Sequence, residues 1–160
     1  MRRPTFRSTA LAFVSLLVVI QLVPISHDNP AATAGPLTAP APVVSILRRA
    51  CADCHSHDTV WPWYSHVAPV SWLVAQDVHE GRRHLNFSEW AGYTSAVRLK
   101  KLALLSTAVQ EGEMPPWFYM PLHPPSHLST DDINVLTAWA DASTGDEPGI
   151  PFSDPSPAVK

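Results

Sequence analysis

The sequence predicts an all-α domain, and three observations lead to this fold class. Apolar residues recur three or four positions apart in four separate segments, which is the spacing of a helix with one buried face. No segment alternates apolar and polar residues as a half-buried strand would. Proline-rich residues 27–42 and 145–160 bound a stretch of about 100 residues, enough for one small domain. We therefore expect a single helical domain over residues 43–144.

The first 26 residues have the composition of a targeting segment. Arg2, Arg3 and Arg7 precede an apolar run from Leu11 to Ile25, and positive charge before such a run directs the following domain out of the cytoplasm. Residues 9–25 are few for a bilayer of ~30 Å, and the A-x-A-like site at 32–34 lies far beyond the run. We expect a signal anchor at the inner membrane. A signal peptide cleaved to release the protein into the periplasm is the alternative.

Two segments are expected to lie outside the packed domain. Residues 27–42 are rich in proline, alanine and threonine, which predicts an extended, solvated tether. The tail, residues 145–160, carries four prolines and should be loose and disordered.

The first two predicted helices flank a short cysteine-containing segment. The first begins near Pro42, where a missing N–H does no harm, and runs through Ala50 into residues 51–55. The second extends from Pro69 to about Arg83. Its expected inward face comprises Val70, Leu73, Val74, Asp77 and Val78.

The last two predicted helices have clear end signals. The third fits Ser95 to Glu111 and is stopped by Gly112. The fourth starts at Ser129, where acidic residues in the first turn favour the positive helix end. Its expected inward face comprises Ile133, Leu136, Trp139 and Ala140.

The only two cysteines lie in a C-x-x-C-H run, residues 51–55. This pattern is typical of c-type haem attachment, in which two thiols bond the porphyrin and the histidine binds the iron. On a helix, Cys51, Cys54 and His55 are three and four positions apart and leave by nearly the same face. The alternatives are a redox dithiol, half of a Cys₂His₂ zinc site and a structural disulfide. We expect one haem, held covalently through Cys51 and Cys54, with His55 as the proximal iron ligand.

A second iron ligand is expected in the non-helical stretch before the last helix. Met114 lies there, followed by two prolines that should stiffen the loop in an extended form. A thioether is a soft ligand that favours reduced iron, although Met114 could also be a plain core methionine. Met120 and His123, in the same stretch, are the alternative distal ligands.

Other side chains near the motif could also contact a porphyrin. Aromatic residues 61–64 and Trp72 would exclude water from it or simply pack in the core. Arg82 and Arg83 could pair with haem propionates, with an exposed helix end as the alternative.

Several motifs in order resemble the bacterial haem-binding-domain family of small cytochrome c-like proteins. They span nearly all of residues 37–142 and comprise Ala50–Ser56, Trp61–Ser65, Ala68–Trp72, His84–Trp90, Gly112–Pro116 and His123–Pro124. The N-terminal run ending at residues 20–24 also resembles that family. The resemblance implies a small cytochrome c-like helical domain wrapped around one haem and preceded by a hydrophobic segment. By a second resemblance, to class I cytochromes c, His55 is the proximal and Met114 the distal ligand; the Trp61–Trp90 region has no counterpart in the simplest of those proteins.

The expected function is one-electron transfer at the extracytoplasmic face of the membrane, by an electron carrier rather than an enzyme with its own substrate. The alternative is a haem-based sensor or peroxidase-like protein with a displaceable sixth ligand. The formal net charge is −3; without the three N-terminal arginines, 8 basic and 14 acidic residues remain, a net charge of −6. That charge is a poor match for nucleic acid and would suit a redox partner with a basic patch, although it names none.

Overall fold

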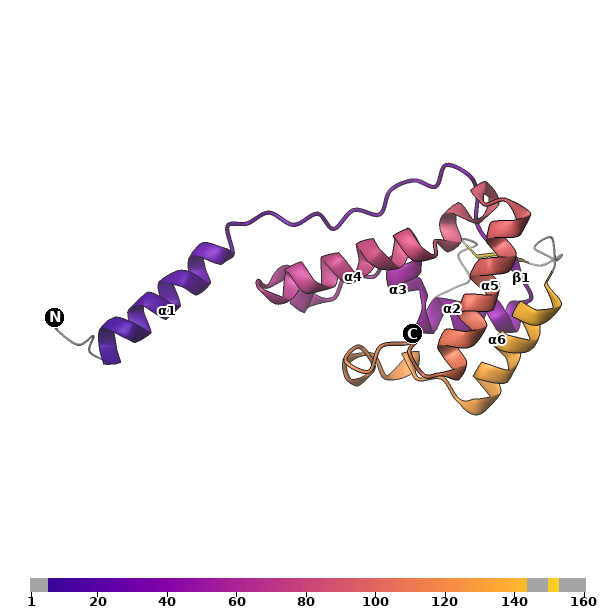
Figure 1. Ribbon diagram of the computed structural model, residues 1–160. Helices are drawn as coiled ribbons and strands as arrows, with labels where there is room; N and C mark the ends of the chain where they lie inside the picture. The colour runs from indigo at the N-terminus through magenta and orange to yellow at the C-terminus, as the bar shows by residue number, and fades with distance from the viewer. Residues whose placement is uncertain (1–5, 144–149, 153–160) are drawn as a thin grey trace.

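The computed structural model of the protein describes residues 6–143 and 150–152, and the described part is mostly helical (Figure 1). Its α-helices are α1 (Phe6–Ile20), α2 (Ala41–Ala50), α3 (Ala52–His55), α4 (Val70–His84), α5 (Ser95–Gln110) and α6 (Thr130–Ala142). Four short 3₁₀ helices connect them: η1 (Trp63–His66), η2 (Phe87–Gly92), η3 (Met120–Leu122) and η4 (Pro124–Ser126). The predicted helical fold class is therefore confirmed for this part of the chain.

The end signals of the later helices act as the sequence predicts. Ser129 caps α6 in a capping box, in which its hydroxyl accepts from the Asp132 N–H and the Asp132 carboxylate accepts from the Ser129 N–H. Thr94 caps α5, and Gly112 follows that helix with a φ of 72°, in the left-handed region that favours glycine.

The first predicted helix is broken at the motif. Cys51 leaves the helical conformation, with φ −127° and ψ −28°, so α2 ends at Ala50 and α3 starts at Ala52. The Cys51 N–H still donates to the Leu47 carbonyl at 2.9 Å, and the Cys51 carbonyl accepts from the His55 N–H at 2.9 Å. The two helices are therefore joined through hydrogen bonds but differ in direction.

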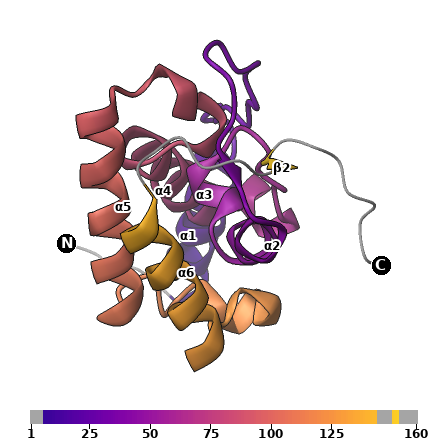
Figure 2. The same cartoon turned by 90° about the vertical axis from the view of Figure 1, so that its right-hand side faces the viewer.

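The hydrophobic core lies between α2, α5 and α6, which pack side by side (Figure 2). Leu47 and Leu136 are fully buried there, and Phe87 from η2 closes one end. Cys51 and Leu85 pack against the same core. The motif is therefore in direct contact with the hydrophobic core of the domain.

Part of the predicted tail belongs to the core. Phe152 is 1% exposed and stacks at a tilt on Phe87, with ring centroids 5.2 Å apart. The Phe152 N–H donates to the Leu37 carbonyl at 2.7 Å, and the Arg48 guanidinium donates to the Phe152 carbonyl. The expectation of a loose tail is wrong for residues 150–152, because a large apolar ring is more stable in the core than in water. Residues 144–149 and 153–160 lie outside the described residues.

The segment expected to be a solvated tether is extended but is held against the domain. Leu37 and Ala39 are buried, and strand β1 (Thr38–Ala39) pairs antiparallel with strand β2 (Ile150–Pro151). Further towards the N-terminus, His27 Nε2 donates to the Ser65 carbonyl at 2.7 Å. An extended chain that is attached by polar contacts has no periodic sequence pattern. The expectation of a solvated tether therefore rested on composition alone.

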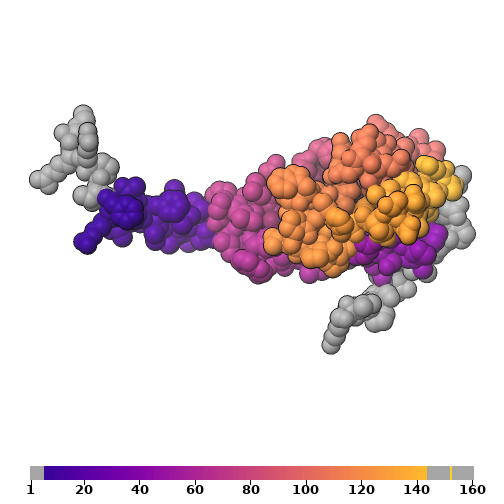
Figure 3. All heavy atoms as spheres, turned by 90° about the horizontal axis from the view of Figure 1, so that it is seen from below, coloured from indigo at the N-terminus to yellow at the C-terminus, as the bar shows by residue number. Residues whose placement is uncertain are grey.

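Helix α1 projects from one end of the molecule, as Figure 3 shows in indigo. It has 15 residues and buries none of them. Just beyond it, the Gln21 amide donates to the Ala68 carbonyl and accepts from the Ala68 N–H, both at 3.0 Å. Within the residues that the structure describes, no helix has both the length and the apolar character needed to cross a membrane.

Candidate functional site

Residues 52–55 of the C-x-x-C-H motif form α3, which lies between α2 and α4, and Cys51 joins α2 to α3 (Figure 1). Cys51 and Cys54 are partly buried and are not joined in a disulfide. Burial raises the pKa of Cys51 to about 12, and burial together with Asp53 and Asp77 raises the pKa of Cys54 to about 12. Both groups are therefore thiols at neutral pH. A reactive redox dithiol would instead have a lowered thiol pKa, so this alternative has no support here.

His55 is held in the tautomer that a metal ligand needs. Its Nδ1 lies 3.0 Å from the Gly81 carbonyl and 3.0 Å from the Leu85 carbonyl, both at the end of α4. Carbonyl oxygens only accept, so Nδ1 carries the hydrogen and the Nε2 lone pair is available for a metal. Burial lowers the pKa of His55, which favours the neutral imidazole. This arrangement, a ligand histidine oriented through its other nitrogen, is the usual one at metal sites.

Gly81 lets α4 approach the motif closely. A Cβ atom at this position would lie 2.4 Å from the Cys54 carbonyl oxygen and 3.0 Å from Cys54 Cβ. The absence of a side chain therefore brings the Gly81 carbonyl within reach of His55. No role for Gly81 was expected from the sequence, although a glycine inside a predicted helix is a signal of close packing.

The predicted inward face of α4 is only partly covered by protein. Val78 is buried, but Val70 is 42% and Leu73 is 63% exposed. Val70, Val74 and Asp77 follow helical spacing to Gly81, so they share the face that touches the motif. The face of α4 that contacts Cys54 thus leaves apolar surface of Val70 uncovered, together with the exposed Asp77, and an apolar cofactor could pack there.

The loop of residues 113–127 lies on the other side of the motif and also exposes large apolar side chains. Trp117 is 79%, Phe118 52% and Leu122 64% exposed. Tyr119 attaches the loop to the motif, since its hydroxyl donates to Asp53 Oδ2 at 2.6 Å. This hydrogen bond was not expected from the sequence, because residues 66 positions apart leave no local signal of their contact.

The three predicted distal ligands all lie in this loop, in different environments. Met114 is 40% exposed at the start of the loop, and its N–H donates to the Ala108 carbonyl of α5 at 3.2 Å. Met120 is half-buried in η3. His123 Nε2 is hydrogen-bonded to the Tyr64 hydroxyl at 2.5 Å. The loop is not extended after Met114 as expected, because the Pro116 carbonyl accepts from the Tyr119 N–H and forms a turn.

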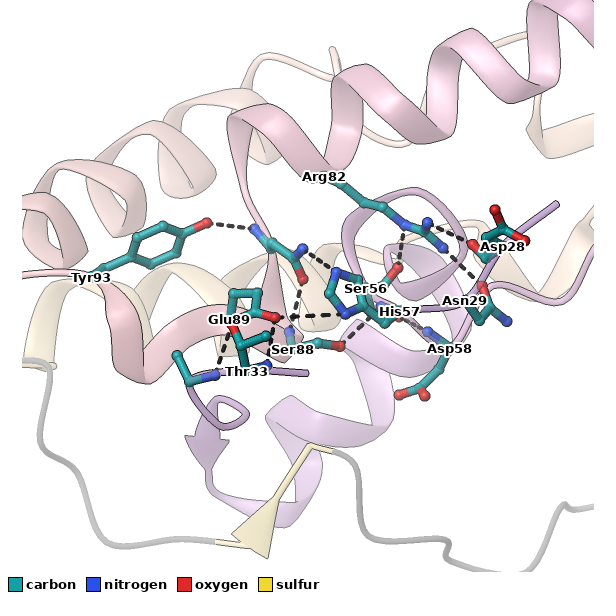
Figure 4. Close-up of polar contacts among 12 residues, drawn as sticks. Asp28, Asn29, Thr33, Ser56, His57, Asp58, Arg82, Ser88, Glu89 and Tyr93 are labelled. Carbon is teal, nitrogen blue, oxygen red and sulfur yellow. Dashed lines mark hydrogen bonds and ion pairs between the residues drawn. The ribbon is translucent and has the colours of Figure 1, made fainter. Parts of the chain in front are cut away.

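A polar network behind the motif fixes the chain on both sides of it (Figure 4). The Arg82 guanidinium donates to the Ser56 and Asp28 carbonyls and to the Asn29 and Thr59 side chains, each at 2.8 Å. Arg82 therefore binds groups of the protein itself, whereas the sequence suggested that it could pair with a haem propionate. Arg83 pairs with Glu80 on the surface.

The same network orders the residues that follow His55 (Figure 4). The His57 N–H donates to Ser88 Oγ at 2.9 Å, and His57 Nε2 accepts from the Asn86 amide at 2.8 Å. The Glu89 carboxylate accepts from the Thr33 and Ala34 N–H groups and from the Thr33 hydroxyl. The chain between α1 and α2 is thereby joined to the segment that carries Leu85, an acceptor for His55.

A zinc site involving the two cysteines finds no support. Across residues 6–143 and 150–152, no three His, Cys, Asp or Glu side chains are grouped so that they could hold a metal ion. The site instead combines two thiols, one neutral imidazole and exposed apolar surface on two sides.

Comparison with known proteins identifies a family. A family model described as a haem-binding domain matches residues 15–142, a range that begins in α1 and ends at the last residue of α6. No curated protein and no solved structure matches the chain.

Proposed function

The chain belongs to the haem-binding-domain family, and from this premise we propose that it is a monohaem c-type protein that transfers single electrons on the extracytoplasmic side of the membrane. Haem supplies an iron that can gain and lose one electron. The chain's own residues would attach it, set its ligands and exclude water. The observation that carries the proposal is the pairing of two unbridged thiols with a histidine whose Nδ1–H is already held by two carbonyls.

Cys51 and Cys54 would hold the porphyrin covalently. Each thiol would add across one vinyl group, so that its sulfur bonds one vinyl carbon and its hydrogen goes to the other. The spacing of the two cysteines supports this attachment. The break at Cys51 also supports it, because Cys51 lies outside the helix that carries Cys54. No oxidant or reductant is consumed in either addition.

His55 Nε2 would bind the iron. The two carbonyl acceptors on Nδ1 make the imidazole more electron-rich, which stabilises oxidised iron. Because both carbonyls belong to the end of α4, the ligand's orientation depends on how that helix packs on the motif. The apolar faces of α4 and of the 113–127 loop would then cover the porphyrin and complete the small core.

Met114 remains our proposed distal ligand, with Met120 and His123 as alternatives. Ligation by a thioether would raise the reduction potential relative to two nitrogen ligands. A redox partner protein and attachment to the inner membrane through residues 9–25 complete the proposal. The targeting composition of the N-terminal segment and the net negative charge of the rest support them.

Mass spectrometry and optical spectroscopy of the protein, produced with haem-maturation machinery, test covalent attachment. We expect a polypeptide mass increased by one haem and a Soret band that survives denaturation. The Cys51→Ala, Cys54→Ala double variant should lose the covalent mass, whereas Ser56→Ala, a neighbouring control, should keep it. An unmodified mass and a colourless wild-type protein would contradict the proposal.

A ligand sensor or peroxidase-like protein is the second candidate function. It is favoured by the exposure of Met114, whose backbone is tied to α5, and by the hydrogen bond that occupies His123. If none of Met114, Met120 and His123 ligates the iron, the sixth position is open. Rapid CO binding by the reduced protein would support this function, and a CO-inert reduced protein would exclude it.

A further inference from the structure

We propose that Asp53, Tyr64, Tyr119 and His123 form a latch that fixes the 113–127 loop on the haem motif and thereby determines how easily the sixth iron position opens. The inference rests on the proposed function with Met114 as the distal ligand, and it assigns roles to residues that do not bind the iron in that arrangement. We call these four residues the loop latch. They act as positioning residues, since none of them needs to touch the iron.

The latch grips η3 at both ends. Tyr119 precedes η3, and its hydroxyl donates to Asp53 Oδ2 within the motif at 2.6 Å. His123 follows η3, and its Nε2 is hydrogen-bonded to the Tyr64 hydroxyl at 2.5 Å. Met120, an alternative distal ligand, lies between the two attachment points. Movement of η3 away from both the motif and η1 (Trp63–His66), which carries Tyr64, would therefore break both hydrogen bonds.

Ring stacking couples the two attachment points. The Tyr119 and His123 rings are nearly parallel, with an interplanar angle of 8° and centroids 4.0 Å apart. The Tyr64 ring meets His123 edge-on, with centroids 6.2 Å apart. Such ring contacts stabilise the packed arrangement beyond the burial of the ring areas. The two hydrogen bonds should therefore open together rather than one at a time.

Asp53, the acceptor in the loop latch, is also held by residues outside the 113–127 loop. Asp53 Oδ1 accepts from the Val60 N–H at 3.0 Å, and the Asp53 carbonyl accepts from the Thr59 hydroxyl at 2.7 Å. Burial and the neighbouring Asp53 raise the pKa of Tyr119, so its phenol stays protonated and donates. A hydrogen bond to a carboxylate is about twice as strong as one between neutral groups. The bond from Tyr119 is thus the stronger of the two attachments.

Tyr119→Phe tests the latch, since it removes the hydroxyl but keeps the ring that stacks on His123. Tyr93→Phe is the matched control: it removes a hydroxyl that accepts from the Asn86 N–H, a contact outside the loop. In haem-free protein, we expect amide hydrogen exchange of residues 119–123 to rise about tenfold in Tyr119→Phe and to stay unchanged in Tyr93→Phe. In reduced, haem-loaded protein, CO should bind at least severalfold faster to Tyr119→Phe than to the control.

Asp53→Asn shows whether both partners act through one bond. It should give a smaller increase in exchange by itself and no further increase in the Tyr119→Phe background. Exchange and CO binding that match the Tyr93→Phe control would overturn the latch. Failure of the wild type to carry haem would instead contradict the proposed function, while amide exchange would still decide whether the latch exists.

Discussion

Gly81→Ala should separate α4 from the haem motif. The new Cβ would lie 2.4 Å from the Cys54 carbonyl oxygen, whereas ordinary contacts begin near 3.4 Å. The obstacle is backbone, which cannot rotate away as a flexible side chain could. Helix α4 must therefore move by about 1 Å, which lengthens the two 3.0 Å hydrogen bonds from His55 Nδ1 beyond the hydrogen-bonding range.

The expected loss of stability follows from three contributions. Overpacking costs about 1–3 kcal/mol, and leaving the buried Nδ1–H without acceptors costs about 1–3 kcal/mol. Alanine inside a helix gains about 1 kcal/mol over glycine. We therefore expect the free energy of unfolding to fall by about 3 kcal/mol, whereas helix propensity alone would raise it.

Urea denaturation of haem-free protein measures this change. Gly92→Ala is the control, since its Cβ would meet only the Ala34 methyl group, at 3.0 Å, on an exposed segment. It should alter the free energy of unfolding by less than about 1 kcal/mol. In the haem-loaded protein, Gly81→Ala should also make the reduction potential more positive, because the imidazole loses electron density. A Gly81→Ala protein as stable as the wild type would refute the close-approach argument.

Three further predictions concern the distal ligand, the C-terminal segment and acid stability. Met114→Ala should abolish the near-infrared band of methionine-ligated oxidised haem and lower the reduction potential, while Met120→Ala and His123→Ala should leave both in place; an unaltered Met114→Ala spectrum would contradict the distal assignment. Phe152→Ala should reduce the free energy of unfolding by about 3 kcal/mol, measured by urea denaturation, because the ring is fully buried against the core; a loss below about 0.5 kcal/mol would mean that this segment adds nothing. The salt bridge from α2, with the Ser129 cap, lowers the pKa of Asp132 from 3.8 to about 2, so its contribution is complete above about pH 4 and is lost as the pH falls through 2. Asp132→Asn should therefore remove about 1–2 kcal/mol at neutral pH and almost none near pH 2, and a loss independent of pH would argue against the ion pair.

The sequence was sufficient wherever a local rule decided the structure. Helix periodicity located α4 and α5, and the start of α6, to within one or two residues, because the apolar spacing and the cap residues act over a few neighbouring positions. The C-x-x-C-H run identified the candidate attachment residues in the same way, since the pattern itself encodes their common face. The family match supports the cofactor that this run indicated.

Tertiary structure decided what depends on residues far apart in the chain. The acceptors of His55 lie 26 and 30 positions away, and the bond from Tyr119 to Asp53 spans 66 positions. Likewise, Phe152 enters the core beside Phe87, although its own neighbourhood is rich in proline. No short-range pattern specifies such contacts, because they arise only when helices and loops have packed. The sequence by itself thus determined which residues could bind a haem, and the packing of α4 and the 113–127 loop decided how those residues are oriented.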